Sequence, residues 1–207
     1  MKKFLFQGDS ITDASRVREN EKCLGQGYAT IVASQLGLEN PGKIDFVNKG
    51  ISGNRIVDLY ARIKSDIINL KPDYLSILIG INDVWHEFSY QNGVDTNKFE
   101  KIYSMLIEEI KEALPDVKIF ILEPFIGHGT AADENWDYFY SETLERAKAA
   151  KRVAEKYNLK FIPLQSKFEE AEAIAPYDYW TLEGVHPTSM GHGIIARELI
   201  EAFKNQI

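Results

Sequence analysis

The strongest constraint on the fold is a regular alternation along the chain of short apolar runs and longer stretches with helical periodicity. Five runs are rich in Ile, Val, Phe and Leu, at residues 3–7, 44–48, 74–79, 117–122 and 160–164. Their length and composition are typical of strands that are buried on both faces. Strands that alternate with helices predict an α/β fold, in which a parallel sheet carries helices on both of its faces.

Helical patterns occupy the intervals between these runs. Apolar residues recur at spacings of three and four over residues 56–70 and 99–113, and each set would form one apolar stripe on a helix. We expect these helices to end before Pro72 and Pro115, because proline suits a helix stop. Further helices are expected at residues 28–36, 142–157 and 189–203. Residues 123–135 are expected to form a long loop, and loops of this length are often functional.

Composition narrows the class of protein. The 207 residues favour a single domain over residues 1–207, since a domain usually takes about 100–200 residues. The net charge of −7 argues against nucleic acid or an anionic membrane surface as the main partner. The single cysteine, Cys23, excludes an intrachain disulfide, and no apolar run approaches the roughly 18–20 residues of a membrane span.

The start of the chain has two lysines followed by three apolar residues, from Phe4 to Phe6. A secretory signal peptide needs about 7–15 apolar residues in succession. We therefore expect this segment to be the first strand of a cytoplasmic protein. A chain from which a signal peptide had already been removed would look the same.

Polar clusters follow the predicted strands. Residues 8–12 (GDSIT) follow the first strand, residues 48–54 (NKGISGN) the second and residues 80–83 (GIND) the third, while residues 183–187 (EGVHP) precede the last helix. Ligands of such sheets bind outside the carboxyl ends of the strands, so we expect these clusters to share one edge. Together they hold a hydroxyl, glycine amides, a carboxamide, a carboxylate and an imidazole, which are the components of an acyl-transfer site.

Each candidate residue also has a simpler interpretation. Ser10 could cap a helix, Gly50 could serve a turn, and Asn82 could be a turn or cap residue. His186 could be an ordinary surface histidine. The joint placement of four clusters with complementary chemistry at one edge favours the functional interpretation over these alternatives.

Other polar residues near the motifs receive no catalytic role. Asp9 and Asp83 are expected to support their loops as turn or cap carboxylates. The stretch that contains Asp13, Ser15 and Arg16 is interpreted as solvated.

The histidines give no sign of a metal site. The spacing between His186 and His192 fits no zinc signature, and adding His128 does not create one. We expect His192 to be a structural residue at the start of the last helix.

The clusters together resemble the motifs of the SGNH hydrolases, the GDSL esterase family. The Ser, Gly, Asn and His for which that family is named match Ser10, Gly50, Asn82 and His186, in the family's order. Wider segments are similar to a bacterial branch of carbohydrate acetyl esterases, the xylan and rhamnogalacturonan acetyl esterase-like group. The resemblance covers about residues 4–203. It implies a three-layer α/β/α sandwich with a five-stranded parallel sheet in flavodoxin-like order.

The resemblance implies a serine esterase mechanism that requires no metal and no organic cofactor. Ser10 would attack an ester carbonyl, and His186 would take the proton of its hydroxyl. The backbone N–H groups of Ser10 and Gly50 and the side-chain amide of Asn82 would form the oxyanion hole.

The acid of the triad is where this chain departs from the family. The family usually has Asp three residues before the catalytic histidine, and this chain has Glu183 there. Some α/β-hydrolases use Glu as the triad acid, so we expect Glu183 to orient His186. In the alternative, Glu183 is a structural carboxylate, and Asp178 or a backbone carbonyl orients the imidazole.

Aromatic residues near the motifs indicate the substrate class. Trp85 and Trp180 are the candidate substrate-binding residues, because flat aromatic faces bury the C–H surface of sugar rings. In the simpler interpretation these aromatic side chains pack in the core. The expected substrate is a small-molecule or oligosaccharide ester with a short acyl group, most simply acetyl. A homo-oligomer is compatible with the sequence, but the sequence identifies no surface as a subunit interface.

The sequence is also compatible with three other classes of function. The same scaffold could carry a thioesterase, a lysophospholipase or a general arylesterase, which acyl-chain length profiling would separate. A flavodoxin-like ligand-binding protein without hydrolytic activity is a second alternative. A third is a non-catalytic sugar-binding member of the family.

Overall fold

The sheet is parallel throughout in the computed structural model, which describes residues 1–205. Its five strands are β1 (Lys2–Gly8), β2 (Ile44–Asn48), β3 (Tyr74–Leu78), β4 (Lys118–Leu122) and β5 (Lys160–Ile162). They lie in the order β2-β1-β3-β4-β5, which is the flavodoxin-like order. All five predicted runs are strands, so the predicted sheet is confirmed.

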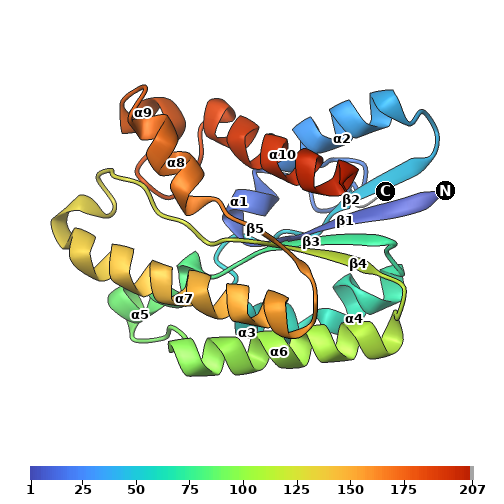
Figure 1. The fold of residues 1–207 in the computed structure, drawn as a ribbon, viewed down its shortest axis with the longest axis horizontal. Coiled ribbons are helices and arrows are strands. Elements are labelled where there is room, and N and C mark those ends of the chain that lie inside the picture. Colours follow the sequence, from blue (N-terminus) through green and yellow to red (C-terminus); the bar gives the residue numbers. More distant parts are fainter. Residues whose placement is uncertain (206–207) are drawn as a thin grey trace.

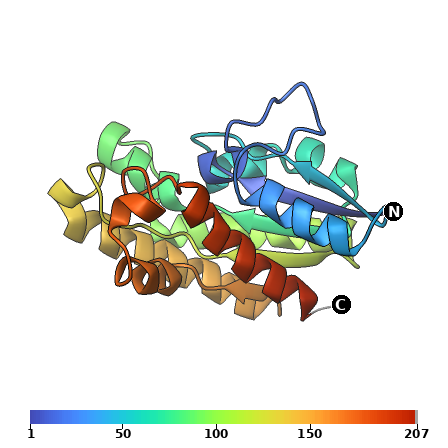
Figure 2. The same ribbon diagram turned by 90° about the horizontal axis from the view of Figure 1, so that it is seen from above.

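Helices cover both faces of the sheet, as Figures 1 and 2 show. The helices are α1 (Ser10–Asp13), α2 (Tyr28–Glu39), α3 (Ile56–Ala61), α4 (Ile63–Asp66), α5 (Ile81–Tyr90), α6 (Thr96–Ala113), α7 (Trp136–Lys156), α8 (Gln165–Glu172), α9 (Tyr177–Trp180) and α10 (Ser189–Lys204). Two 3-10 turns, η1 (Ile68–Leu70) and η2 (Asp133–Asn135), complete the set. In Figure 1, α2, α8 and α10 lie on one side of the sheet, and α3, α4, α6 and α7 lie on the other. The predicted three-layer α/β/α architecture is confirmed.

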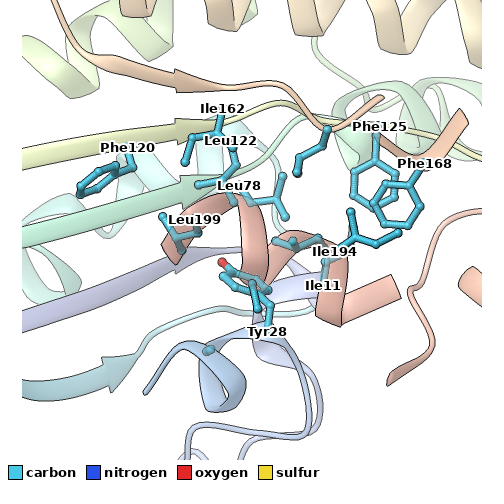
Figure 3. Close-up of a cluster of buried hydrophobic side chains, with 14 of the residues drawn as sticks. Ile11, Tyr28, Leu78, Phe120, Leu122, Phe125, Ile162, Phe168, Ile194 and Leu199 are labelled. Atoms are coloured by element: carbon cyan, nitrogen blue, oxygen red, sulfur yellow. The ribbon is translucent and has the colours of Figure 1, made fainter. Parts of the chain in front are cut away.

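The two faces of the sheet bury separate apolar clusters, because successive side chains of a strand point to opposite sides. Phe4 and Phe6 of β1 belong to the cluster beneath α2 and α10, which Figure 3 shows, whereas Leu5 belongs to the cluster beneath α3 and α6. At one end of the first cluster, the rings of Phe125 and Phe168 stack with their centroids 4.0 Å apart. Burial on both faces explains why the inner strands β1, β3 and β4 are mostly apolar beyond their first residues.

The helix predicted over residues 56–70 is not continuous. Helices α3 and α4 are separated at Arg62, and α4 is separated from η1 at Ile67. The guanidinium of Arg62 donates to Lys49 O at 2.8 Å and to Asp66 at 3.0 Å, so it ties the segment to the loop after β2. Apolar residues continue at spacings of three and four across both breaks, so periodicity alone predicts a single helix over residues 56–70.

Candidate active site

Ser10 is the first residue of α1, immediately after β1. Asp9, not Ser10, is the N-cap, since its Oδ1 accepts from the Ile11 N–H at 3.0 Å. Gly8 permits the sharp turn, because a Cβ there would lie 2.3 Å from Leu78 O. The Ser10 hydroxyl therefore does not cap α1. Within residues 1–205, the backbone N–H of Ser10 also has no acceptor.

The hydroxyl of Ser10 is hydrogen-bonded to the imidazole of His186. Ser10 Oγ lies 2.9 Å from His186 Nε2, and His186 Nδ1 is hydrogen-bonded to Glu183 Oε1. The backbone N–H of His186 also donates to Glu183 Oε1, at 3.2 Å. A proton on Nδ1, directed at the carboxylate, leaves Nε2 as the acceptor for the serine hydroxyl. The three side chains form one continuous hydrogen-bonded chain.

The electrostatics of His186 favour a charged imidazole. The hydrogen bond to Glu183 raises the pKa of His186, and partial burial opposes that shift. Asp9 contributes a smaller attraction from the turn between β1 and α1. Burial raises the pKa of Asp9 to about 7, and the amide of Ile11 partly offsets this shift. The site therefore stabilises an imidazolium next to the serine.

Asn82 lies in the first turn of α5, at the same edge of the sheet. One N–H of its side-chain amide donates to Asn54 O at 3.1 Å, and a carboxamide nitrogen carries a second. The neighbouring Asp83 is buried and accepts from the Ile56 N–H at 3.1 Å. Asp9 caps its own turn as expected, whereas Asp83 accepts from the start of α3 and so joins α5 to a different segment of the chain.

Gly50 is not placed as its expected role requires. Its backbone N–H donates to Asn48 Oδ1 at 2.8 Å, so this donor is already occupied inside the protein. The glycine is needed for another reason, since a Cβ at this position would lie 2.4 Å from Asp13 N and 2.7 Å from Thr12 C. Gly50 therefore allows the loop after β2 to approach α1, and its N–H is not free for an oxyanion.

Gly53, three residues further along the same loop, has the properties that Gly50 lacks. Its backbone φ is +81°, and a Cβ built on it would meet no atom within 4 Å. Its N–H has no acceptor among residues 1–205. The segment NKGISGN contains both glycines, so the sequence pattern alone does not distinguish them.

The expectation of a solvated stretch is wrong for Asp13, whereas Ser15 is exposed and Arg16 is half-buried. The Asp13 side chain is buried, and its Oδ2 accepts from Arg18, from the Ser52 N–H and from the Ser52 hydroxyl. Arg16 Nε donates to Gly50 O at 2.9 Å. The last residue of α1, Asp13, and Arg16 after it therefore fix the loop that carries Gly50 and Ser52.

A cavity of about 600 Å³ opens beside Ser10 and His186. Polar and apolar side chains share its wall: Ser15, Gln26, Ser52, Thr188 and Ser189, with Ile11, Ala14, Leu182, Pro187 and Met190. Trp85 and Trp180 are not part of the lining that residues 1–205 provide. The ring of Trp85 stacks on Phe139 at 4.6 Å, and Trp180 Nε1 donates to Ala175 O. Their substrate-binding role stays a prediction.

His192 lies in α10 and also lines this cavity. Its Nδ1 accepts from the Tyr28 N–H at 3.2 Å, which joins α10 to α2. Burial, and to a smaller extent the nearby His186, lower the pKa of His192 to about 4. A neutral imidazole that accepts a backbone N–H fits the expected structural role.

No group of three or more His, Cys, Asp and Glu side chains within residues 1–205 is arranged to hold a metal ion. Within the same range, no helix combines the length and the apolar character needed to cross a membrane.

The flavodoxin-like sheet and the Ser-His-carboxylate chain at its carboxyl edge together define a hydrolase of the SGNH class. The protein belongs to the GDSL-like lipase/acylhydrolase family, whose model matches residues 6–194. This makes it a carboxylic ester hydrolase.

Individual relatives are similar over almost the whole chain. An acetylxylan esterase of Geobacillus stearothermophilus is 36% identical, over 96% of this chain and 92% of that protein. The structure of a GDSL-like lipase from Parabacteroides merdae has a TM-score of 0.93 at 36% identity and covers 98% of this chain and 95% of its own. The structure of an acetylxylan esterase from Geobacillus stearothermophilus has a TM-score of 0.86 at 34% identity, covering 97% and 93%.

Proposed function

We propose that this protein is a serine esterase that removes short acyl groups, most simply acetyl, from carbohydrates. One contact carries the proposal: the Ser10 hydroxyl is hydrogen-bonded to His186, which is hydrogen-bonded to Glu183, at the wall of a cavity. The similarity to an acetylxylan esterase over nearly the full length supports the choice of substrate. Hydroxyl groups in the cavity wall can hydrogen-bond the hydroxyl groups of a sugar.

Ester hydrolysis in this site depends on proton transfer between Ser10, His186 and the leaving alcohol. Ser10 Oγ attacks the acyl carbon while His186 Nε2 takes the hydroxyl proton. The tetrahedral intermediate collapses, the ester C–O bond breaks, and His186 returns the proton to the leaving alcohol. Water then attacks the acyl-enzyme with His186 as the base, which releases the acid and restores Ser10.

The oxyanion is stabilised by three N–H groups that are not used by other acceptors in the protein. The Ser10 N–H and the Gly53 N–H have no acceptor among residues 1–205, and the Asn82 side chain has a second N–H. Gly53 replaces Gly50 in this assignment, because the Gly50 N–H is occupied by Asn48. Free, fixed donors lower the barrier only where the negative charge develops.

Glu183 is the acid of the triad in this proposal. It stabilises the imidazolium that forms when Ser10 loses its proton, and it holds the Nδ1–H tautomer of His186. Structures of the related esterase include catalytic mutants in which one serine or one aspartate is replaced by alanine. In this chain the carboxylate that contacts the imidazole is Glu183, whose side chain is one methylene longer than aspartate.

Hydrolysis assays test the function directly. The wild type and Ser10→Ala are compared on a chromogenic acetyl ester and then on acetylated xylo-oligosaccharides, with acetate release as the readout. Ser141→Ala is the control, because that exposed serine on α7 donates only within its own helix. We expect acetate release by the wild type and the control alone. A strong preference for long-chain esters or thioesters would instead support a lysophospholipase or thioesterase, and unchanged turnover in Ser10→Ala would refute the mechanism.

A further inference from the structure

The loop between β4 and α7 packs directly on the backbone that carries Glu183. The N–H of Gly127 donates to Gly184 O at 2.8 Å, and the N–H of Ala131 donates to Glu183 O at 3.1 Å. These two bonds hold the peptide groups on the C-terminal side of Glu183 and Gly184. They are independent of the contacts that the Glu183 side chain makes with His186.

The contact leaves no space for side chains. A Cβ on Gly129 would lie 2.2 Å from Glu183 C and 2.5 Å from Gly184 N, and a Cβ on Gly184 would lie 2.6 Å from Gly127 O. Gly184 also has a φ of +102°, which favours glycine. The two backbone segments therefore lie too close together for a side chain between them, and a shift of one must displace the other.

Asp133 holds the loop in this shape. Its Oδ1 accepts from the Gly129 N–H at 3.0 Å and from His128 Nδ1 at 2.9 Å. The Asp133 N–H donates back to Gly129 O at 2.9 Å. The ring of His128 stacks on Trp136 with centroids 3.9 Å apart, which anchors the loop to the start of α7. Both donors lower the pKa of Asp133, so it is ionised near neutral pH.

We propose that residues 127–133 position the triad acid, and that Asp133 is the positioning residue that keeps this segment closed on Glu183. This inference rests on the proposed role of Glu183. The side chain of Glu183 has one more rotatable bond than aspartate, so a carboxylate at the correct distance requires a fixed backbone beneath it. The loop supplies that fixed backbone.

The expected effect reaches His186 through Glu183. Two carboxylates raise the pKa of the imidazole: Glu183 on its own loop and Asp9 from the turn after β1. The third titratable group nearby is His192 on α10, which is neutral near pH 7 because its pKa is lowered to about 4. The bond to Glu183 is the largest cause of the raised pKa of His186. If the loop opens, this bond weakens while Asp9 and His192 stay in place, so the pKa of His186 falls.

The variants are Asp133→Ala, which removes the acceptor, and Asp133→Asn, which keeps an oxygen at the same position. Glu134→Ala is the matched control, because Glu134 is an exposed acid in the same loop with no partner among residues 1–205. We expect Asp133→Ala to lower kcat on a short ester by about tenfold, less than the roughly 10²-fold that a 1 Å misplacement costs. Asp133→Asn should retain most of the activity, and Glu134→Ala all of it.

Two readouts separate this inference from the proposed function. The pKa of His186, measured by NMR titration of the ring in the folded protein, should fall in Asp133→Ala whether or not an ester is turned over. In a Glu183→Ala background, Asp133→Ala should cause no further loss of kcat, since the two residues act in series. An unchanged His186 pKa, or an equal loss of kcat in both backgrounds, would overturn the inference. Absence of ester hydrolysis in the wild type would overturn the proposed function alone.

His128→Ala is the second variant if Asp133→Ala does not fold. It removes one of the two donors to Asp133 and the stack on Trp136, but it leaves the Gly129 N–H bonded to Asp133. We expect it to shift the His186 pKa in the same direction by a smaller amount. A shift in the opposite direction, or none, would contradict the positioning role.

Discussion

Ser10 Oγ lies 2.9 Å from His186 Nε2, although 176 positions separate the two residues in the chain. β1 lies inside the sheet between β2 and β3, so its carboxyl end delivers Ser10 to the middle of the edge. His186 arrives on the segment that precedes α10, and α10 is fixed against α2 by the bond between His192 and Tyr28. The strand order and the packing of the last helix thus create the contact, and no local motif could.

The coupling of this pair predicts non-additive mutations. Ser10→Ala and His186→Ala should each lower kcat on an acetyl ester by at least about 10⁴-fold, and the double variant should lose no more than either single one. Ser10 cannot attack efficiently without His186, and His186 has no proton to accept without Ser10. Either variant therefore retains only the catalysis that the oxyanion hole provides. Steady-state kinetics of the three variants check this expectation. Losses that multiply in the double variant would mean that the two residues act separately.

Glu183 gives a prediction about pH. Attack requires neutral His186, so kcat/KM rises as the pH increases through the pKa of this residue. The bond to Glu183 raises that pKa above its usual value of 6.5, so the rise should lie above pH 6.5 in the wild type. In Glu183→Gln the rise should move to lower pH, and the maximum rate should fall by less than in Ser10→Ala. The pH profiles of the two proteins measure the shift, and superimposable profiles would exclude Glu183 as the acid.

Asn82 should contribute through its side-chain amide alone. Asn82→Ala removes one oxyanion donor, and we expect kcat to fall by about 10²–10³-fold while KM changes little. The variant also loses the bond to Asn54 O, so a small loss of thermal stability is expected. Asn54→Ala keeps that backbone carbonyl and serves as the control for changes in the loop. A fall in kcat of less than about threefold in Asn82→Ala would remove Asn82 from the oxyanion hole.

The two glycines of the loop after β2 can be distinguished in a covalent complex. A phosphonate bound to Ser10 places a charged oxygen where the oxyanion forms. We expect a crystal structure of this adduct to show that oxygen within about 3.1 Å of the Gly53 nitrogen, with the Gly50 N–H still bonded to Asn48 Oδ1. An oxygen bonded to Gly50 instead would restore the assignment that the sequence motif favours.

The sequence predicts the parts of this molecule that depend on local pattern. The five strands follow from apolar runs, and the edge that carries Ser10, Asn82 and His186 follows from the parallel sheet. The choice between Gly50 and Gly53 does not, because it depends on which N–H a buried Asn48 side chain occupies. The burial of Asp13 is likewise set by Arg18 and by Ser52 from a different loop. Contacts of this kind arise from tertiary packing, which periodicity and motif spacing do not encode.

His192 gives a prediction about stability that is independent of catalysis. Burial lowers its pKa from 6.5 to about 4 in the folded protein. Above pH 6.5 the imidazole is neutral in both the folded and the unfolded state, so it adds no pH dependence there. As the pH falls below 6.5 the unfolded chain binds the proton first, and the folded protein loses stability until the pH reaches about 4. The full loss is about 3 kcal/mol.

The variant His192→Asn should remove this loss, because an amide oxygen can accept from the Tyr28 N–H without titrating. Asp9, with a pKa raised from 3.8 to about 7, acts in the opposite direction over the whole of this range, since the folded state holds the proton more tightly than the unfolded chain. Because Asp9 is present in both proteins, its contribution cancels when they are compared. Urea unfolding at pH 7 and at pH 4.5 should therefore show wild-type stability falling relative to His192→Asn at the lower pH. Parallel pH dependence of the two proteins would mean that His192 titrates in the folded protein much as it does in water.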